Sequence, residues 1–320
     1  MTRIVVDGMD MAWFMEARQT IDRASSKHDL PLMYHAAFHF LRECGIGNVR
    51  LSPAQGGFVY TFPDAASGGS LHLEGLTKQL SRVFHPAPMD VGTGGARTGG
   101  SARGCRVDNE LADIINRGKM PESGTMSLYT LKTLRQLFSE GLKPFCAQVP
   151  VGSLELKLAT ALDVVCININ IRPESAPGGP IQHNVVNGQI KTGFDQNYKV
   201  ARGAMHSPLT RCPSLSVMGD SHANRHTLQL ISEHLIVQRG YGNPLCDSVL
   251  IVISEKTHTV IPVCKELDLV KGVLENLKKR DEKSELELEI AAVKRKHAVK
   301  KVMRRKARFV GLKPKSSIKK

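Results

Sequence analysis

Short apolar runs alternate with longer amphipathic stretches along most of this chain. Arg3–Val6 is a β-branched run that ends at Asp7-Gly8, and Leu30–Cys44 has apolar residues at helical spacing and stops at Gly45. Asn48–Leu51 follows as a second short apolar run. This order predicts a strand, a helix and a strand, which is the arrangement of a parallel βαβ unit.

Residues 52–123 interrupt this rhythm. Gly57–Phe62 has the alternation of a hairpin strand, and Leu73–Phe84 has the spacing of a short helix. Residues 92–104 are mostly Gly, Thr, Ala, Ser and Arg, a composition typical of a linker. We therefore predict that residues 52–123 form a long insertion in the α/β unit.

The alternation of strands and helices resumes after residue 126. The apolar spacing predicts helices over Ser127–Glu140, Leu154–Leu162, Ser221–Gln238 and Val260–Leu269, and strands over Pro144–Val149, Val164–Ile171, Leu215–Asp220 and Ser248–Ser254. Residues 172–213 are rich in Pro, Gly and Asn and predict a second insertion. The fold class predicted is α/β with a mostly parallel sheet over residues 1–271. Residues 272–320 are predicted to form a charged helix and a basic tail.

Composition excludes several classes of protein. The chain has 320 residues, of which 41% are hydrophobic and 23% charged, so a mainly disordered chain is excluded. No run approaches the 18 apolar residues of a membrane span, and the first residues have a strand pattern rather than that of a signal peptide. The seven cysteines are scattered without Cys-x-x-Cys spacing, which argues against a zinc site or a disulfide framework. We expect an intracellular protein, nuclear or cytoplasmic, without a membrane partner.

Basic charge is concentrated at one end of the sequence. The segment 294–320 holds 13 of the 44 Lys and Arg residues and no acid, which leaves 31 basic against 30 acidic residues in the first 293. Such a segment attracts phosphate polyanions with a steep dependence on salt. RNA is the partner we expect, and the nucleic-acid-binding residues predicted are Lys294, Arg295, Lys296, Lys300, Lys301, Arg304, Arg305, Lys306 and Arg308. The same cluster is also typical of a nuclear import signal.

Three predicted strands end in acidic or polar residues. Asp7 and Asp10 follow the first strand, Asp220 ends a later one, and Glu255 follows the last. The carboxyl ends of parallel strands meet at one edge of a sheet, and carboxylates there would hold Mg²⁺ or Mn²⁺. Such a metal would promote hydrolysis of a phosphodiester. A structural role for Asp220 as a helix N-cap is an equally weighted alternative.

The opening of the chain resembles that of NYN-type PIN-like ribonucleases, particularly the Regnase group. The similarity lies in Arg3–Ala12, with its strand ending in Asp-Gly-x-x-x-Ala, and in the helix, strand and acidic blocks at 128–150 and 215–267. The resemblance implies a three-layer α/β/α fold and a divalent metal site. Asp7, Asp10 and Asp220 would be its metal ligands, and Asp7, Asp220 and Glu255 its catalytic carboxylates.

The sequence also departs from this family. The second aspartate of the central acidic pair is here Ser221, and the last strand is followed by Glu255-Lys256 where the family has aspartate. An alternative register puts Asp108 and Asp113 at the central acidic position. A different enzyme class is also open, because Gly219-Asp-Ser-His-Ala-Asn224 resembles the nucleophile block of SGNH-type esterases.

Two hypotheses of function follow from these observations. The first is an RNA-binding, metal-dependent endoribonuclease that uses Mg²⁺ or Mn²⁺. The second is a catalytically inactive PIN-like protein that binds RNA or assembles a complex, in which the charged C-terminal helix contacts other proteins. Ser221 and Lys256 favour the second hypothesis, since both reduce the number of carboxylates at the predicted site.

Overall fold

The computed structural model describes part of the chain. The described residues are 5–6, 9–10, 37, 40, 49–54, 57–63, 68–83, 99–119, 126–171, 184–193, 222–242, 245–255, 258–262 and 272–274. The chain divides into two compact units, Met1–Leu274 and Glu275–Lys320, and all described residues belong to the first. The predicted site residues Asp7 and Asp220 and the whole basic segment 294–320 lie outside the described residues.

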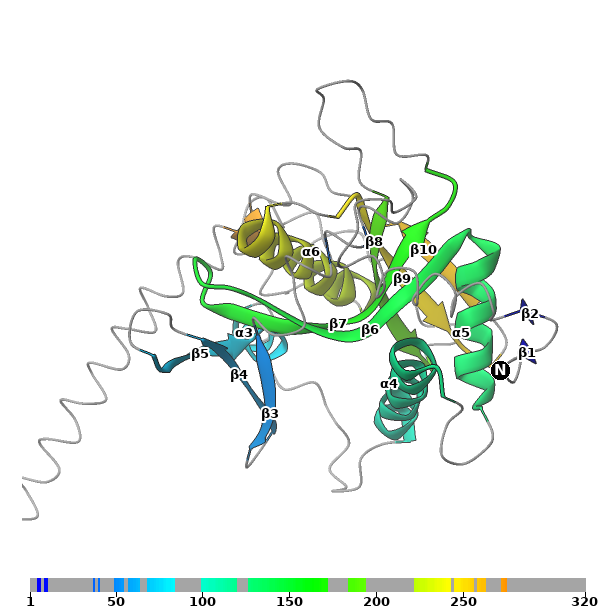
Figure 1. Ribbon diagram of the computed structural model, residues 1–320, viewed down its shortest axis with the longest axis horizontal. Coiled ribbons are helices and arrows are strands. Elements are labelled where there is room, and N and C mark those ends of the chain that lie inside the picture. Colours follow the sequence, from blue (N-terminus) through cyan, green and yellow to red (C-terminus); the bar gives the residue numbers. More distant parts are fainter. Residues whose placement is uncertain are drawn as a thin grey trace, which may run out of the picture. The chain divides into compact units, whose positions relative to one another are not determined.

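An eight-stranded mixed sheet forms the frame of the first unit (Figure 1). Its strands are β3 (Arg50–Ala54), β4 (Gly57–Pro63), β5 (Ser70–Gly75), β6 (Leu142–Ser153), β7 (Leu158–Asn168), β8 (Val185–Thr192), β9 (Asp247–Ile253) and β10 (His258–Pro262). They follow the order β10-β9-β8-β7-β5-β4-β3, and β6 pairs with β7 off this path. The α/β class is confirmed. The sheet is mixed, since β5–β7 and β8–β9 are parallel and the other five described pairs in it are antiparallel.

Strand β7 is the centre of this arrangement. On one side it pairs with β6 along its whole length, in a long hairpin whose turn is 154–157. On the other side its end at Val164–Ile167 pairs with β8, while its start at Leu158–Ala159 pairs with β5. The neighbours of β7 therefore diverge, and the sheet opens between β8 and β5.

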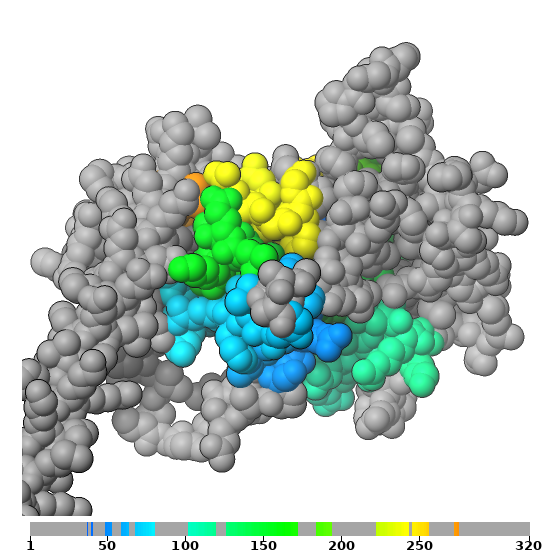
Figure 2. All heavy atoms as spheres, turned by 60° about the vertical axis from the view of Figure 1, so that its left-hand side comes forward, coloured from blue at the N-terminus to red at the C-terminus, as the bar shows by residue number. Residues whose placement is uncertain are grey.

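Helices cover both faces of the sheet. α4 (Gly99–Arg117) and α5 (Leu128–Ser139) contact each other and pack on β6, α4 also on β8 and α5 on β9 and β10. α6 (His222–Tyr241) packs on β6, β7 and β9, with α3 (Leu76–Val83) beside it. Figure 2 shows α6, the turn of the β6–β7 hairpin and the β3–β5 region adjoining one another. Among the described residues, no helix is long and apolar enough to cross a membrane.

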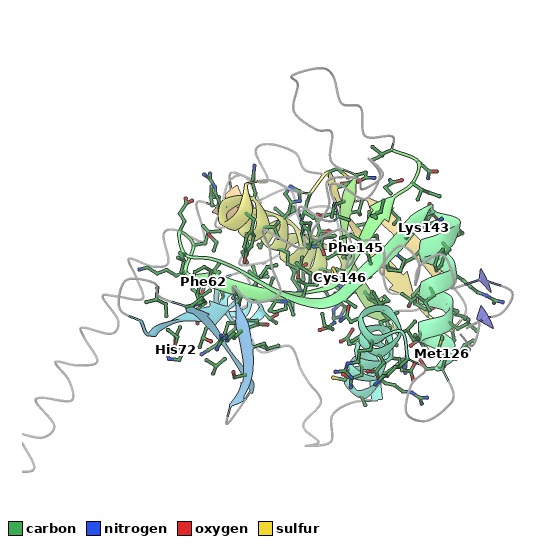
Figure 3. All side chains as sticks on the ribbon, in the orientation of Figure 1. Phe62, His72, Met126, Lys143, Phe145 and Cys146 are labelled. Carbon is green, nitrogen blue, oxygen red and sulfur yellow. The ribbon has the colours of Figure 1, made fainter. Side chains whose placement is uncertain are left out.

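The core lies between these layers. Phe145 and Cys146 of β6 are buried at its centre (Figure 3), and the Phe145 ring meets that of Phe40 edge-on at 6.0 Å between centroids. A second apolar cluster under the β3–β5 strands consists of Val49, Leu73 and Ala159, with Tyr60 and Phe62 packed against it. Both clusters bury large apolar surfaces, which is the main stabilising contribution in a unit of this size.

Several predicted elements differ from the observed ones. Residues 154–162, predicted as a helix, form the hairpin turn and the start of β7. β8 lies within the predicted insertion 172–213 yet is a central strand, and α4 begins inside the predicted linker 92–104. Most of β7 is buried on both faces, so its sequence lacks the alternation of a half-buried strand. The polar residues of β8 made it resemble a loop.

Candidate functional site

A carboxylate occupies the opening where β8 leaves β7. Asp163 lies four residues after Ala159, the last β7 residue paired with β5, and directly before Val164, the first residue paired with β8. One of its oxygens, Oδ2, accepts a hydrogen bond from the backbone N–H of Ile190 at 2.9 Å. The side chain of Asp163 thus supplies to β8 the acceptor that the diverging backbone of β7 no longer offers. This contact fixes the carboxylate against the middle of β8.

Strand β8 presents three polar side chains on one face. Asn187, Gln189 and Lys191 alternate with Gly188 and Ile190, as strand geometry requires. The two amides point toward α6, where Asn187 Nδ2 donates to Glu233 Oε2 at 3.1 Å and Gln189 Nε2 to Glu233 Oε1 at 3.1 Å. The carbonyl oxygens of both amides, Asn187 Oδ1 and Gln189 Oε1, are buried without a hydrogen-bond partner. Buried acceptors of this kind are available to a cation or a donor.

Glu233 of α6 and Lys191 of β8 add a carboxyl group and an ammonium group to the cluster. Glu233 is fully buried and accepts a third amide hydrogen bond, from Gln229 Nε2 at 3.0 Å. Lys191 Nζ lies 3.5 Å from Gln229 Oε1. Burial, followed by the charge of Asp163, raises the pKa of Glu233 to about 8, although Lys191 and the hydrogen bonds act in the opposite direction.

Asp108 approaches from helix α4. Burial and then the neighbouring charge of Asp163 raise the pKa of Asp108 to about 7, and Lys191 partly offsets this. Burial likewise raises the pKa of Asp163, against the effects of Lys191 and of the Ile190 N–H. In the described part of the chain, three carboxyl groups thus share a poorly solvated region with one ammonium group, that of Lys191. Such an arrangement disfavours full ionisation unless a cation is added.

The donor set of this cluster fits a hard divalent cation. Carboxylate oxygens of Asp108 and Asp163 and the unpartnered Gln189 Oε1 are the ligand type that Mg²⁺ and Mn²⁺ prefer. Within the described ranges, no group of three His, Cys, Asp or Glu side chains has metal-binding spacing. One or two carboxylates suffice for Mg²⁺, however, because this ion retains several waters and takes further oxygens from a phosphate substrate.

Two of the predicted acidic residues belong to described elements or their ends, and neither is on the strands and helices that form this cluster. Asp10 is in β2 (Met9–Asp10), which pairs with β1 (Val5–Val6) in a separate two-stranded sheet. The expected first strand of the main sheet is therefore not part of it. Glu255 is exposed beyond β9, accepts a hydrogen bond of 3.4 Å from the Tyr129 hydroxyl, and is not among the groups that shift the pKa of Asp108 or Asp163.

Sequence reasoning missed most of the cluster. Asp163 lies between the predicted helix 154–162 and the predicted strand 164–171 and is not among the predicted site residues, while Gln189 and Lys191 lie in the predicted insertion 172–213. Asp108 appeared only in the alternative register. The available signal was Val185-Val-Asn-Gly-Gln-Ile-Lys191, in which polar residues recur at every second position, as in a strand with one polar face.

The described residues include only part of the alternative esterase site. Ser221, the nucleophile of the esterase interpretation, lies outside them, and the rings of His222 and His226 are 6.3 Å apart at the start of α6. Comparison with protein-family models gives no match, and a search of curated proteins likewise gives none.

Proposed function

We propose that this protein is a metal-dependent nuclease that hydrolyses phosphodiester bonds of RNA, with Asp108 and Asp163 as its metal-binding carboxylates. One observation carries the proposal: Asp163, anchored to the Ile190 N–H, shares a poorly solvated opening in the sheet with Asp108 and Lys191. The proposed reaction is the one expected from the sequence. The proposed residues differ from the predicted set, in which Asp10 belongs to the separate β1–β2 sheet and Glu255 contacts Tyr129.

Each group of the cluster has a distinct role in this reaction. A bound Mg²⁺ or Mn²⁺ supplies Lewis acidity at the phosphate and a more acidic water. Asp108 and Asp163 hold the cation, and the Ile190 N–H orients Asp163. Lys191 offers positive charge to the phosphate oxygens as charge develops on them. Glu233 is a positioning residue, since its hydrogen bonds fix the amides of Asn187 and Gln189 beside Lys191.

RNA is proposed as the substrate on the basis of charge. Outside residues 294–320 the chain is nearly neutral, whereas this segment carries 13 basic residues without an acid. The segment would supply affinity that does not depend on base sequence, and the carboxylates would supply the chemistry.

RNA binding without cleavage is a second candidate function. The observation that favours it is the near-complete internal pairing of Glu233, which accepts three amide hydrogen bonds. A network of this kind also stabilises a fold without any catalytic role. In that case the protein holds RNA through its basic segment alone.

Cleavage of end-labelled single-stranded RNA by the full chain, in Mg²⁺, Mn²⁺ or EDTA, separates the two candidates. We expect metal-dependent cleavage that Asp163→Asn reduces roughly a hundredfold or more, because a lost metal ligand removes several kcal/mol of transition-state stabilisation. Asparagine retains an oxygen to accept the Ile190 N–H, so the fold should persist. Asp113→Asn is the matched control, since Asp113 lies on α4 and pairs with Arg117.

Asp7→Asn tests the originally predicted site in the same assay. Retained cleavage by Asp7→Asn, with loss in Asp163→Asn, supports the proposed cluster. Loss of cleavage in Asp7→Asn, with cleavage retained in Asp163→Asn, would instead assign catalysis to the amino-terminal aspartates. Absence of metal-dependent cleavage in the wild type, with RNA binding intact, would leave the second candidate function.

A further inference from the structure

A second polar group lies at the carboxyl ends of β8 and β9, beyond the carboxylate cluster. Arg103 of α4 places its guanidinium carbon 4.7 Å from the centroid of the Tyr129 ring, and its Nη1 donates to the Tyr129 hydroxyl at 3.1 Å. Tyr129 belongs to the first turn of α5. The two helices thus meet through a cation–π contact reinforced by a hydrogen bond.

Gly193, directly after β8, lies against the same guanidinium. A Cβ atom at Gly193 would come within 2.6 Å of Arg103 Nη1, and the residue has φ +86°, which favours glycine. Its N–H donates to the Ile253 carbonyl at 2.9 Å, which ties the end of β8 to the end of β9. Arg103 therefore lies beside Gly193, which is two residues after Lys191, at the end of the strand that carries Gln189 and Lys191.

Two other arginines of α4 form ion pairs with carboxylates, and Arg103 does not do so with any described residue. Arg106 pairs with Glu110 at 2.7 Å and Arg117 with Asp113 at 2.6 Å. Among the described residues, Arg103 has no carboxylate within ion-pair distance, and its hydrogen bond goes to a neutral hydroxyl. Its planar fork retains further N–H donors, the geometry that matches two oxygens of a phosphate.

Among the described residues, the one acid in contact with this group, Glu255, is already near a second cation, Lys132. Glu255 accepts the 3.4 Å hydrogen bond from Tyr129, and Lys132 Nζ donates to the backbone carbonyls of Ser254 and Glu255. Two cations and one carboxylate leave the described group with a net charge of +1. That sign suits an anion that lies across the ends of β8 and β9.

We infer that Arg103, held by Tyr129 and Gly193, binds a backbone phosphate of the RNA strand next to the cleavage site. The inference rests on the proposed function for its ligand. It assigns to the folded unit a phosphate contact separate from the basic segment 294–320. Phosphate contacts of this kind set the position of a strand without reading its bases.

The test is the salt dependence of RNA binding by the full chain, measured in EDTA so that no cleavage occurs. A single-stranded oligonucleotide with a fluorescent label is titrated at several salt concentrations, using wild type, Arg103→Ala, Arg103→Lys and Arg117→Ala. We expect Arg103→Ala to weaken binding roughly tenfold and to reduce the slope of log K against log salt by about 0.7. Arg103→Lys should keep the slope, and Arg117→Ala should match the wild type.

Equal slopes and affinities for Arg103→Ala and the wild type would overturn the inference. Arg103→Gln, which keeps much of the side-chain length, replaces the alanine variant if that variant does not fold. The outcome is independent of the proposed catalysis, because binding in EDTA reports Arg103 even if the wild type shows no cleavage in Mg²⁺.

Discussion

Glu233 shows how strongly a single buried carboxyl group depends on its neighbours. In the folded chain its pKa is raised from the ordinary value of 4.5 to about 8, first by burial and then by Asp163. Between these two values the folded state holds a proton that the unfolded state has released. The free energy of unfolding therefore falls as pH rises through this window, by about 1.4 kcal/mol per pH unit.

Glu233→Gln should remove this contribution of residue 233. Glutamine is neutral at every pH, and its NH₂ can donate to Asn187 Oδ1 and Gln189 Oε1, which now lack partners, once those amides rotate. We expect urea unfolding in EDTA to show a smaller loss of stability from pH 5.5 to pH 8 than in the wild type, where Asp108 contributes as well. The exposed Glu155→Gln is the control, and an unchanged pH dependence in Glu233→Gln would contradict the assignment.

The residues of the cluster were predictable in type but not in identity. The sequence predicted acidic groups at strand ends, whereas Asp163 lies within β7, where the neighbouring strands β5 and β8 diverge. Divergence of neighbouring strands is a property of the whole sheet. No local pattern around Asp163 encodes it.

At the scale of elements, α5 shows a locally encoded helix completed by a distant residue. Ser127 Oγ accepts the Thr130 N–H at 3.2 Å as an N-cap, and the helix was predicted with nearly its observed bounds. Glu110 of α4 accepts both the Ser127 N–H at 2.9 Å and the Thr130 hydroxyl at 2.6 Å. Burial acts to raise the pKa of Glu110, but its hydrogen bonds from Thr130, Arg106 and Ser127 lower it overall.

Ser127→Ala should lower the free energy of unfolding by about 1 kcal/mol, since the Thr130 N–H loses its side-chain acceptor. Ser127→Thr keeps a hydroxyl acceptor and should remain close to the wild type. Urea unfolding at pH 7 measures both variants. Equal stability of the alanine and threonine variants would show that Glu110, rather than the Ser127 hydroxyl, caps this helix.

Local encoding explains which elements were predicted. α6 and β9 have clear periodicity and flanking signals, and the structure places both close to their expected bounds. The first half of β7 was predicted as a helix because β7 is apolar on both faces, and β8 was missed because it carries Asn, Gly, Gln and Lys. They form strands because they pair with each other and because β8 pairs with β9. The free energy of this pairing outweighs the weak intrinsic strand propensity of their residues.

At the scale of the whole molecule, the basic segment is expected to dominate affinity for RNA. A chain ending at Val293 loses 13 positive charges and no negative ones. We expect its RNA affinity to fall and its log–log salt slope to decrease by several units, with an upper limit of about nine if every charge contacts a phosphate. Fluorescence titration of wild type and truncated chain measures this. Cleavage at saturating RNA should persist, and an unchanged slope would place binding on the folded unit instead.

The sequence by itself determined the α/β class, the local helices α5 and α6, the separation of a nearly neutral region from a basic one, and the expectation of carboxylate chemistry. These properties depend on composition and on spacing over a few residues. The tertiary structure decided which carboxylates meet. Asp108, Asp163 and Glu233 come from α4, β7 and α6, and Asp163 interacts with both others where the pairing of β8 with β7 ends, beyond Gly188. Their raised pKa values depend on burial and on interactions between residues up to 83 positions apart, as for Asp108 and Lys191, which spacing along the chain does not specify.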